Sequence, residues 1–138
     1  RISGYEETMK KAGLKAYIDI EKVDILNPKP GVQKALTDMV NNKHTDAVIF
    51  LTNMLAINGL YCLNEMNIKV PDDIAVIGFS RNVAFDLYYS PITFIKQPIE
   101  QIAENAINTL VSRIKNENYI HKCFLEPELI VQKSSLKK

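Results

Sequence analysis

The sequence predicts an α/β fold, a parallel sheet with helices on both faces, and three observations support this prediction. Helix-like and strand-like segments alternate along the first 80 residues. Residues 74–77 form a short apolar run between turn-forming residues, which is typical of a strand buried on both faces. Gly78 follows, where the backbone must turn sharply or approach another group closely. Phe79 and Ser80 would then lie at the carboxyl end of a central strand, where open α/β sheets bind ligands.

Composition and charge describe one globular domain. Of its 138 residues, 46% are hydrophobic and 24% charged, so the chain can bury a solid core. The net charge of +1 argues against a self-sufficient nucleic-acid-binding domain. No apolar run approaches the roughly 18 residues of a membrane span. Cys62 and Cys123 lack metal-ligand spacing and favour free thiols in a reducing compartment, with a disulfide as the alternative. The chain starts with Arg1, so we expect a piece of a longer protein.

The first part of the chain is expected to contain a helix, a strand and a second helix. Apolar residues at helical spacing predict a helix over 1–12, which Gly13 would end. A weak alternation predicts a strand that begins at 16 and ends at 20 or 25. The prolines and the glycine of 27–31 predict a loop. A second helix is predicted over 32–40 from its apolar spacing.

The rest of the chain continues the alternation and then becomes irregular. Thr52 and Asn53 end a buried strand and offer a cap for the next helix. The strongest helical pattern in the chain follows Pro98. The Lys-rich end, 133–138, is expected to be a solvated tail. The predicted elements are strands over 46–51, 74–77, 93–97, 119–125 and 129–131, and helices over 54–66 and 98–115.

No catalytic or metal-binding constellation is visible in the sequence. His44 and His121 stand alone, without a cysteine or carboxylate at ligand spacing. No nucleophile has an evident base, and no glycine-rich phosphate loop is present, so we predict no enzyme, no cofactor and no metal site. Asp72 and Asp73 precede a strand, away from its ligand-binding end, which favours a turn and capping role.

Two polar residues follow the carboxyl ends of predicted parallel strands. Asn53 follows the strand 46–51, and Ser80 follows the strand around 74–77. Parallel strands carry their carboxyl ends to the same edge of the sheet, so both side chains would project into one crevice. The alternative is that Asn53 only caps a helix and Ser80 only turns the chain, the commoner use of these residues.

Five segments together resemble the LacI/GalR family of bacterial transcription repressors. They occur in the family's order and spacing, across nearly the whole chain. The resemblance implies a periplasmic-binding-protein-like effector domain (type I) of two α/β lobes, with a small ligand between them. It also implies that a DNA-binding helix-turn-helix and most of the first lobe precede Arg1. The segments are Arg-x-x-Gly-Tyr (1–5), Asp-Ala-Val-Ile-Phe-Leu-Thr-Asn (46–53), Val-Pro-Asp-Asp-Ile-Ala-Val-Ile-Gly-Phe (70–79), Pro-Ile-Thr-Phe-Ile-Lys-Gln-Pro (91–98) and Glu-Pro-Glu-Leu-Ile-Val (126–131).

The resemblance divides the chain between the two lobes. Residues 1–94 and 128–138 would form most of the second lobe, and 95–127 would be a crossover segment of the first lobe. The fold is therefore expected to be incomplete. The helix 98–115 has a wide apolar stripe whose burial is worth several kcal/mol at about 25 cal/mol per Å². We expect it to pack against another copy of the chain, to fold back on the sheet, or to be disordered.

The resemblance also implies a set of effector contacts. Arg1 would reach ligand hydroxyls or carboxylates with its fork of donors, unless it frays as a terminus. Asn53 would bind ligand hydroxyls. Ser80 stands where most members carry an aspartate, and Met54 also replaces an aspartate common in the family. Leu26 stands where many members place a stacking aromatic, so a contact with a sugar face is in doubt. The expected ligand-binding residues are Arg1, Leu26, Asn53, Phe79, Ser80, Arg81 and Gln97.

These expectations add up to the effector-binding and dimerisation region of a LacI-type regulator. The expected partners are a small effector, a second copy in a homodimer, and operator DNA through the helix-turn-helix. Arg81 beside the neutral Ser80 suggests the hypothesis that the effector is a sugar acid rather than a neutral sugar. We expect a cytoplasmic protein without a membrane partner. The main alternative is a periplasmic sugar-binding protein of the same architecture, which a signal peptide would favour.

Overall fold

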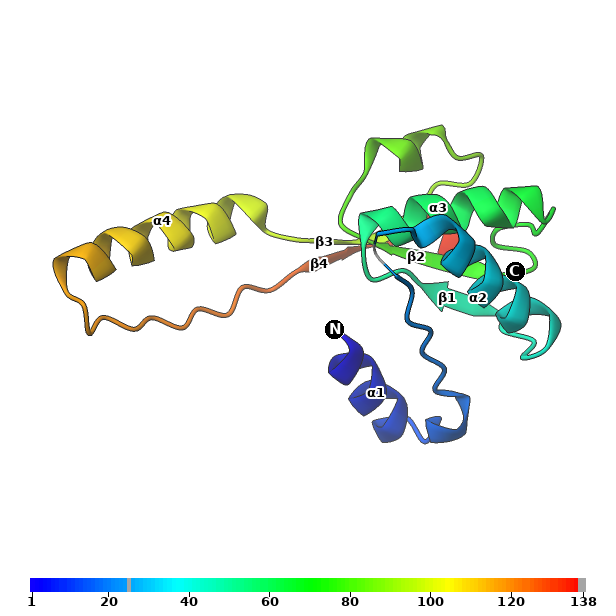
Figure 1. The fold of residues 1–138 in the computed structure, drawn as a ribbon, viewed down its shortest axis with the longest axis horizontal. Coiled ribbons are helices and arrows are strands. Elements are labelled where there is room, and N and C mark those ends of the chain that lie inside the picture. Colours follow the sequence, from blue (N-terminus) through cyan, green and yellow to red (C-terminus); the bar gives the residue numbers. More distant parts are fainter. Residues whose placement is uncertain (25, 137–138) are drawn as a thin grey trace.

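The computed structural model describes residues 1–24 and 26–136 as an α/β fold with one long arm (Figure 1). The α/β class expected from the sequence is confirmed. In chain order, the elements are helix α1 (Ile2–Lys11), 3-10 helix η1 (Lys15–Tyr17), helix α2 (Pro28–Asn41), strand β1 (Ala47–Ile49), helix α3 (Asn53–Glu65), strand β2 (Ala75–Phe79), 3-10 helix η2 (Val83–Leu87), strand β3 (Thr93–Lys96), helix α4 (Ile99–Lys115), strand β4 (Glu128–Ile130) and 3-10 helix η3 (Lys133–Ser135).

The sheet has four strands in the order β1-β2-β3-β4. β1, β2 and β3 run parallel, with Ile49 opposite Ile77 and Phe79 opposite Ile95. β4 runs antiparallel to β3, so the sheet is mixed rather than wholly parallel as the sequence predicted. The three parallel strands still bring their carboxyl ends to one edge, as the prediction of a shared crevice requires.

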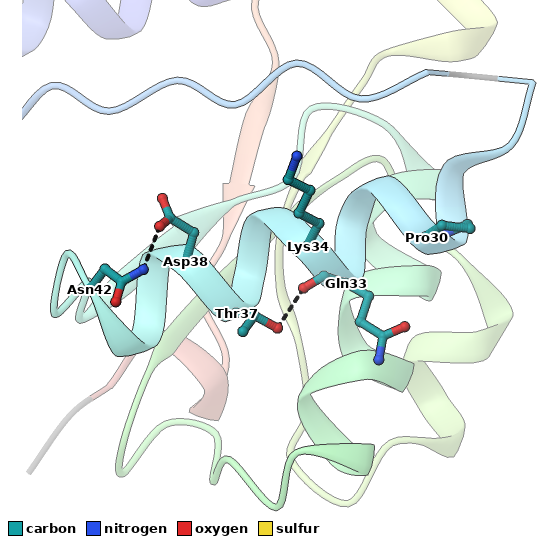
Figure 2. Close-up of a pocket in the computed structure, with 6 residues that line it drawn as sticks. All are labelled: Pro30, Gln33, Lys34, Thr37, Asp38 and Asn42. Carbon is teal, nitrogen blue, oxygen red and sulfur yellow. Dashed lines mark hydrogen bonds between the residues drawn. The ribbon is translucent and has the colours of Figure 1, made fainter.

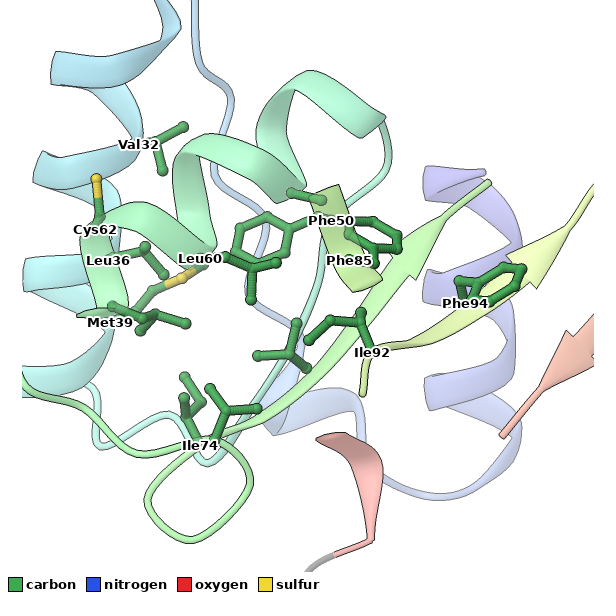
Figure 3. Packing of buried hydrophobic residues seen from close by; sticks show 14 residues of the cluster. Val32, Leu36, Met39, Phe50, Leu60, Cys62, Ile74, Phe85, Ile92 and Phe94 are labelled. Carbon is green, nitrogen blue, oxygen red and sulfur yellow. The ribbon is translucent and has the colours of Figure 1, made fainter. Parts of the chain in front are cut away.

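The hydrophobic core lies between this sheet and the helices α2 and α3, which pack against each other (Figure 3). Its members come from both helices, from β2 and β3, and from the segments beside them. Leu36 of α2 and Leu63 of α3 are 1% and 0% exposed, and Val76 of β2 is fully buried. The buried apolar residues are Val32, Leu36, Met39, Phe50, Ala56, Leu60, Cys62, Leu63, Val70, Ile74, Val76, Phe85, Ile92 and Phe94.

Two glycines allow aromatic rings to enter this core. A Cβ on Gly59 of α3 would lie 2.1 Å from the Phe50 ring, and a Cβ on Gly78 of β2 would lie 2.8 Å from the Phe85 ring. Gly78 thus serves a close approach, one of the two roles expected for it. The strand continues through Gly78 to Phe79, and the turn occurs one residue later, at Ser80, whose φ is +69°.

The region before β1 differs from the sequence prediction at two places. Residues 27–31 do not form a loop, because Pro28 and Pro30 lie in the first turn of α2, where an amide hydrogen is not needed. The strand predicted from residue 16 is absent over 16–24, and residue 25 lies outside the described residues. No strand of the described chain pairs with that segment. Lys43 instead holds it beside α2 through Asp19 and Glu21.

The arm also departs from the prediction. α4 is ordered and extends away from the sheet (Figure 1), so the expectations that it folds back or is disordered are wrong. It buries no residue, and Ile107 and Ile114 are 60% and 76% exposed. Packing against a second copy stays a prediction. The strand expected over 119–125 is also wrong, because this segment returns along the arm with no strand beside it in the described chain.

The carboxyl-terminal segment is docked, at least through residue 135, rather than solvated. Ser134 is fully buried, and its hydroxyl donates to the Val76 carbonyl at 2.6 Å and accepts from the Thr93 amide at 2.8 Å. The Thr93 hydroxyl accepts from the Gln132 amide at 2.8 Å. These bonds fix η3 to β2 and β3, which corrects the prediction of a free tail over those residues.

Candidate functional site

Three parallel strands end at the same edge of the sheet, and a polar side chain follows each of them. Asn53 follows β1 and opens α3, Ser80 follows β2 directly, and Gln97 follows β3 directly. The structure therefore brings these three predicted site residues together from different parts of the chain. This is the edge at which open α/β sheets place their ligands.

Asn53 lies at the start of α3 but does not cap it. The cap is Thr52, whose hydroxyl accepts a hydrogen bond from the Leu55 amide at 3.2 Å. With its amide nitrogen turned toward β2, Asn53 donates to the carbonyl oxygens of Phe79 (3.0 Å) and Ser80 (3.2 Å). The interpretation of Asn53 as a simple cap is therefore wrong. Its side chain connects the end of β2 to the start of α3.

Ser80 is held by its backbone and by its side chain. Its amide donates to the Ile95 carbonyl at 2.9 Å, which extends the pairing of β2 with β3 by one residue. Its hydroxyl accepts a hydrogen bond from the side-chain amide of Gln97. Its φ of +69° lies in the left-handed region that few non-glycine residues adopt. Ser80 does turn the chain, and it also carries a side-chain contact at the candidate site.

Arg1 reaches the same edge from the start of α1. Its guanidinium lies over the Phe79 ring, 3.7 Å from the ring centre, and donates to the carbonyl oxygen of Leu51. Such a cation–π contact holds the guanidinium in place while leaving other donors available. Arg1 and Phe79 thus join Asn53, Ser80 and Gln97 in one cluster.

Two other predicted site residues lie outside this cluster. Leu26 is 90% exposed, which leaves its side chain with almost no packing. Arg81 follows Ser80, but its guanidinium pairs with Asp86 at 3.0 Å, and its side chain is 68% exposed. A carboxylate partner neutralises much of the charge that the sugar-acid hypothesis assigns to Arg81.

A hollow of about 560 Å³ lies where the arm leaves the sheet. Ser80, Arg81 and Gln97 line it on the sheet side. Its charged lining is more acidic than basic, and Lys96 pairs with Glu128 at 3.5 Å. Glu126 and Glu128 flank the proline of the last family-like segment, but sequence reasoning did not place them at the site. The full lining is Ser80, Arg81, Phe94, Lys96, Gln97, Pro98, Ile99, Glu100, Gln101, Glu126 and Glu128.

A second hollow, of about 470 Å³, lies along the outer face of α2 (Figure 2). Two of its polar side chains bond within the helix itself. The Thr37 hydroxyl donates to the Gln33 carbonyl at 2.8 Å, and the Asn42 amide donates to the Asp38 carboxylate at 2.7 Å. Its residues come from α2 and the residue that follows it, and none is a predicted site residue, so this hollow is a poorer candidate.

Metal-binding groups do not gather in the part of the chain that the structure describes. No three side chains of histidine, cysteine, aspartate or glutamate come close enough there to hold a metal ion. Burial, with a smaller contribution from Glu65, raises the pKa of the Cys62 thiol, which disfavours the reactive thiolate. Of the helices within the described ranges, none has both the length and the apolar character needed to cross a bilayer.

The α/β fold, with polar side chains gathered at the carboxyl ends of its parallel strands, is typical of a ligand-binding domain. Comparison with known families agrees. Residues 1–135 match the family described as the periplasmic binding protein-like domain, and the chain belongs to that family. A PurR transcriptional repressor from Histophilus somni (strain 2336) is 30% identical over 135 residues, 97% of this chain and 40% of the repressor. The chain thus spans about 40% of the length of the curated relatives it matches. The predicted resemblance to part of a LacI-type effector domain is confirmed.

Solved structures of transcriptional regulators share the fold. The complex of the regulator CelR with cellobiose has a TM-score of 0.78 and 25% identity, over 96% of this chain and 41% of CelR. A LacI family regulator from Enterococcus faecium with bound ribose has a TM-score of 0.80 and 19% identity, over 97% of this chain and 50% of that chain. The likeness to the Enterococcus protein shows the fold alone.

Proposed function

We propose that this chain is the effector-binding part of a LacI-type transcriptional regulator that senses a small sugar. The observation that carries the proposal is the convergence of Arg1, Asn53, Ser80 and Gln97 at one edge of the sheet. These side chains offer hydrogen-bond donors and acceptors of the kind that bind hydroxyl groups. The relatives are transcriptional regulators, and no enzyme family is indicated, which supports a sensing role over catalysis.

The proposed mechanism is a shift between two arrangements of the regulator. An effector that contacts both the sheet edge and the parts near α4 favours one direction of the arm relative to the sheet. It acts only through the difference between its affinities for the two arrangements. In the proposed regulator, this shift changes operator binding by the DNA-binding domains of a homodimer in the cytoplasm.

A neutral sugar fits the site better than a sugar acid. Arg81 is paired with Asp86 and Lys96 with Glu128, while Glu100 and Glu126 also line the hollow beside Ser80. Carboxylates accept hydrogen bonds from sugar hydroxyls but repel an anionic ligand. We therefore revise the sugar-acid hypothesis and propose a neutral, hydroxyl-rich effector.

Binding measurements on the complete regulator test this function. We expect ribose or cellobiose to raise the melting temperature, and galacturonate to have a smaller effect. Calorimetry should show that Arg1→Met weakens binding of the neutral sugar about tenfold or more, because a charged donor is lost. Lys69→Met, which removes an exposed cation outside both the cluster and the hollow, is the control, and its affinity for the neutral sugar should be unchanged.

Two results would contradict the proposal. Galacturonate binding more tightly than both neutral sugars would restore the sugar-acid hypothesis. The absence of any melting shift with all three probes would remove the sugar-sensing function. A change in operator binding caused by the sugar, in either direction, distinguishes a regulator from a periplasmic sugar-binding protein, which binds no operator.

A further inference from the structure

The end of β2 and the start of the arm meet at a single side-chain contact. Phe79 at the end of β2 is in register with Ile95 of β3. Gln97 follows β3, and after it Pro98 leads into α4. The Gln97 side-chain amide donates to the Ser80 hydroxyl. We call this pair, Ser80 with Gln97, the joint. It links the strand that carries the candidate site to the residue where the chain leaves the sheet.

The Ser80 half of the joint is fixed from its other sides. Its amide bonds to the Ile95 carbonyl, and its own carbonyl accepts from Asn53. Its left-handed φ of +69° is uncommon for a residue with a side chain, so surrounding contacts must maintain it. Gln97 has fewer restraints, because it lies between β3 and the exposed arm. Breaking the joint should therefore move Gln97 and the chain after it more than Ser80.

The joint also has unused hydrogen-bonding capacity beside the hollow that it lines. A serine hydroxyl that accepts one bond can still donate its hydrogen. The side-chain nitrogen of Gln97 is used, while its side-chain oxygen accepts no hydrogen bond from any described residue. Both side chains are half-buried and line the hollow. One donor and one acceptor are thus presented side by side, a combination that adjacent sugar hydroxyls can satisfy.

We propose that Gln97 is a positioning residue that couples effector binding at this edge to the direction of α4, through its hydrogen bond to Ser80. This inference rests on the proposed function and extends it to the route of the signal. An effector bonded to both side chains fixes the start of the arm relative to β2. Without either side chain of the joint, the direction of α4 relative to β2 is no longer fixed, while the other contacts still hold the effector.

Hydrogen–deuterium exchange on the complete regulator tests the joint. The variants are Ser80→Ala, Gln97→Ala and the double variant, with Gln33→Ala on the outer face of α2 as the control. Without any ligand, amides at the start of α4 should exchange at least about 3-fold faster in each joint variant. With saturating ribose or cellobiose, the wild type should gain protection there. The joint variants should bind the sugar more weakly by calorimetry, and should lose most of that gain even at sugar concentrations that saturate each variant.

The double variant and the ligand-free measurement make the outcomes distinct. If both residues act through one bond, amides at the start of α4 exchange no faster in the double variant than in either single variant. If the two single variants speed exchange independently and their effects add in the double variant, the proposal is overturned. It is also overturned if Gln97→Ala exchanges at the wild-type rate. If the wild type binds neither sugar, the proposed function fails. The ligand-free exchange rates then still decide whether the joint restrains α4.

Discussion

At the scale of single residues, Gly59 has the tightest surroundings of the chain's glycines. A Cβ there would lie 2.1 Å from the Phe50 ring, which is 7% exposed and cannot swing into solvent. Gly59→Ala should therefore destabilise the fold by about 1–3 kcal/mol, although alanine is the better helix former. Urea unfolding measures the change. Gly4→Ala in α1 is the control, because nothing lies within 4 Å of its Cβ, and it should be neutral or slightly stabilising.

Ser134 is the second residue whose replacement has a clear expected cost. Its hydroxyl bonds to Val76 and Thr93, and the side chain is fully buried. Ser134→Ala should lower the free energy of unfolding by about 1–3 kcal/mol, because it removes a buried partner from both groups. Ser3→Ala on the exposed face of α1 should change it by less than about 0.5 kcal/mol. Equal unfolding midpoints for the two variants would show that η3 is not firmly docked.

At the scale of elements, the carboxyl end of α2 contains a charge cluster that should respond to acid. The Asn42 side chain, and then Lys43, lower the pKa of Asp38. Lys43 also pairs with Glu21 and Asp19, and these carboxylates, Glu21 most of all, raise its pKa together with Asp38. A lowered carboxyl pKa stabilises the fold above the ordinary value of 3.8, and that contribution is lost as the pH falls through the lowered value.

The comparison of Asp38→Asn with the wild type measures that contribution. We expect the variant to be slightly less stable at pH 7, and the difference to shrink as the pH falls below about 4. Denaturant unfolding across pH 7 to 3 provides the measurement. Gln33→Asn on the same helix changes no titratable group, so it is the control and should show no such trend. A difference between wild type and Asp38→Asn that is constant over this range would contradict the assignment.

The elements that the sequence predicted correctly are those with a strong local pattern. The strands β1 and β2 and the helix α4 were found because their apolar patterns are strong, although β1 is mostly exposed rather than buried as its run predicted. The loop predicted from the prolines of 27–31 was wrong, because proline fits a first helical turn as well as a loop. The strands expected over 16–20 and 119–125 do not form, because a strand needs a neighbour that a local pattern cannot reveal.

The candidate site was predictable only in part, for a similar reason. Positions at the carboxyl ends of strands predicted that Asn53 and Ser80 share one edge. The contacts of Asn53 with Phe79 and of Gln97 with Ser80 depend on how β2 and β3 align, which the sequence does not state. Arg81 was expected at the site for its charge, whereas its partner Asp86, five residues later, became apparent only in the fold.

At the scale of the whole molecule, the arm exposes an apolar stripe that water disfavours. Ile102, Ile107, Leu110 and Ile114 of α4 are each 45% to 76% exposed. We expect this chain alone to self-associate through the stripe, since exposed apolar patches of this kind drive contact. Ile107→Glu with Leu110→Glu should shift it toward monomer in light scattering. Asn108→Glu on the same helix is the control, and equal masses for both variants would contradict this role of the stripe.

The arm is attached to the sheet at one pair of opposed residues. Lys96, the last residue of β3, lies directly opposite Glu128, the first residue of β4. The chain leaves and re-enters the sheet at neighbouring positions, so residues 97–127 form an insertion whose two ends nearly touch. A tight hairpin turn of a few residues could replace that insertion and leave the helix-backed sheet intact.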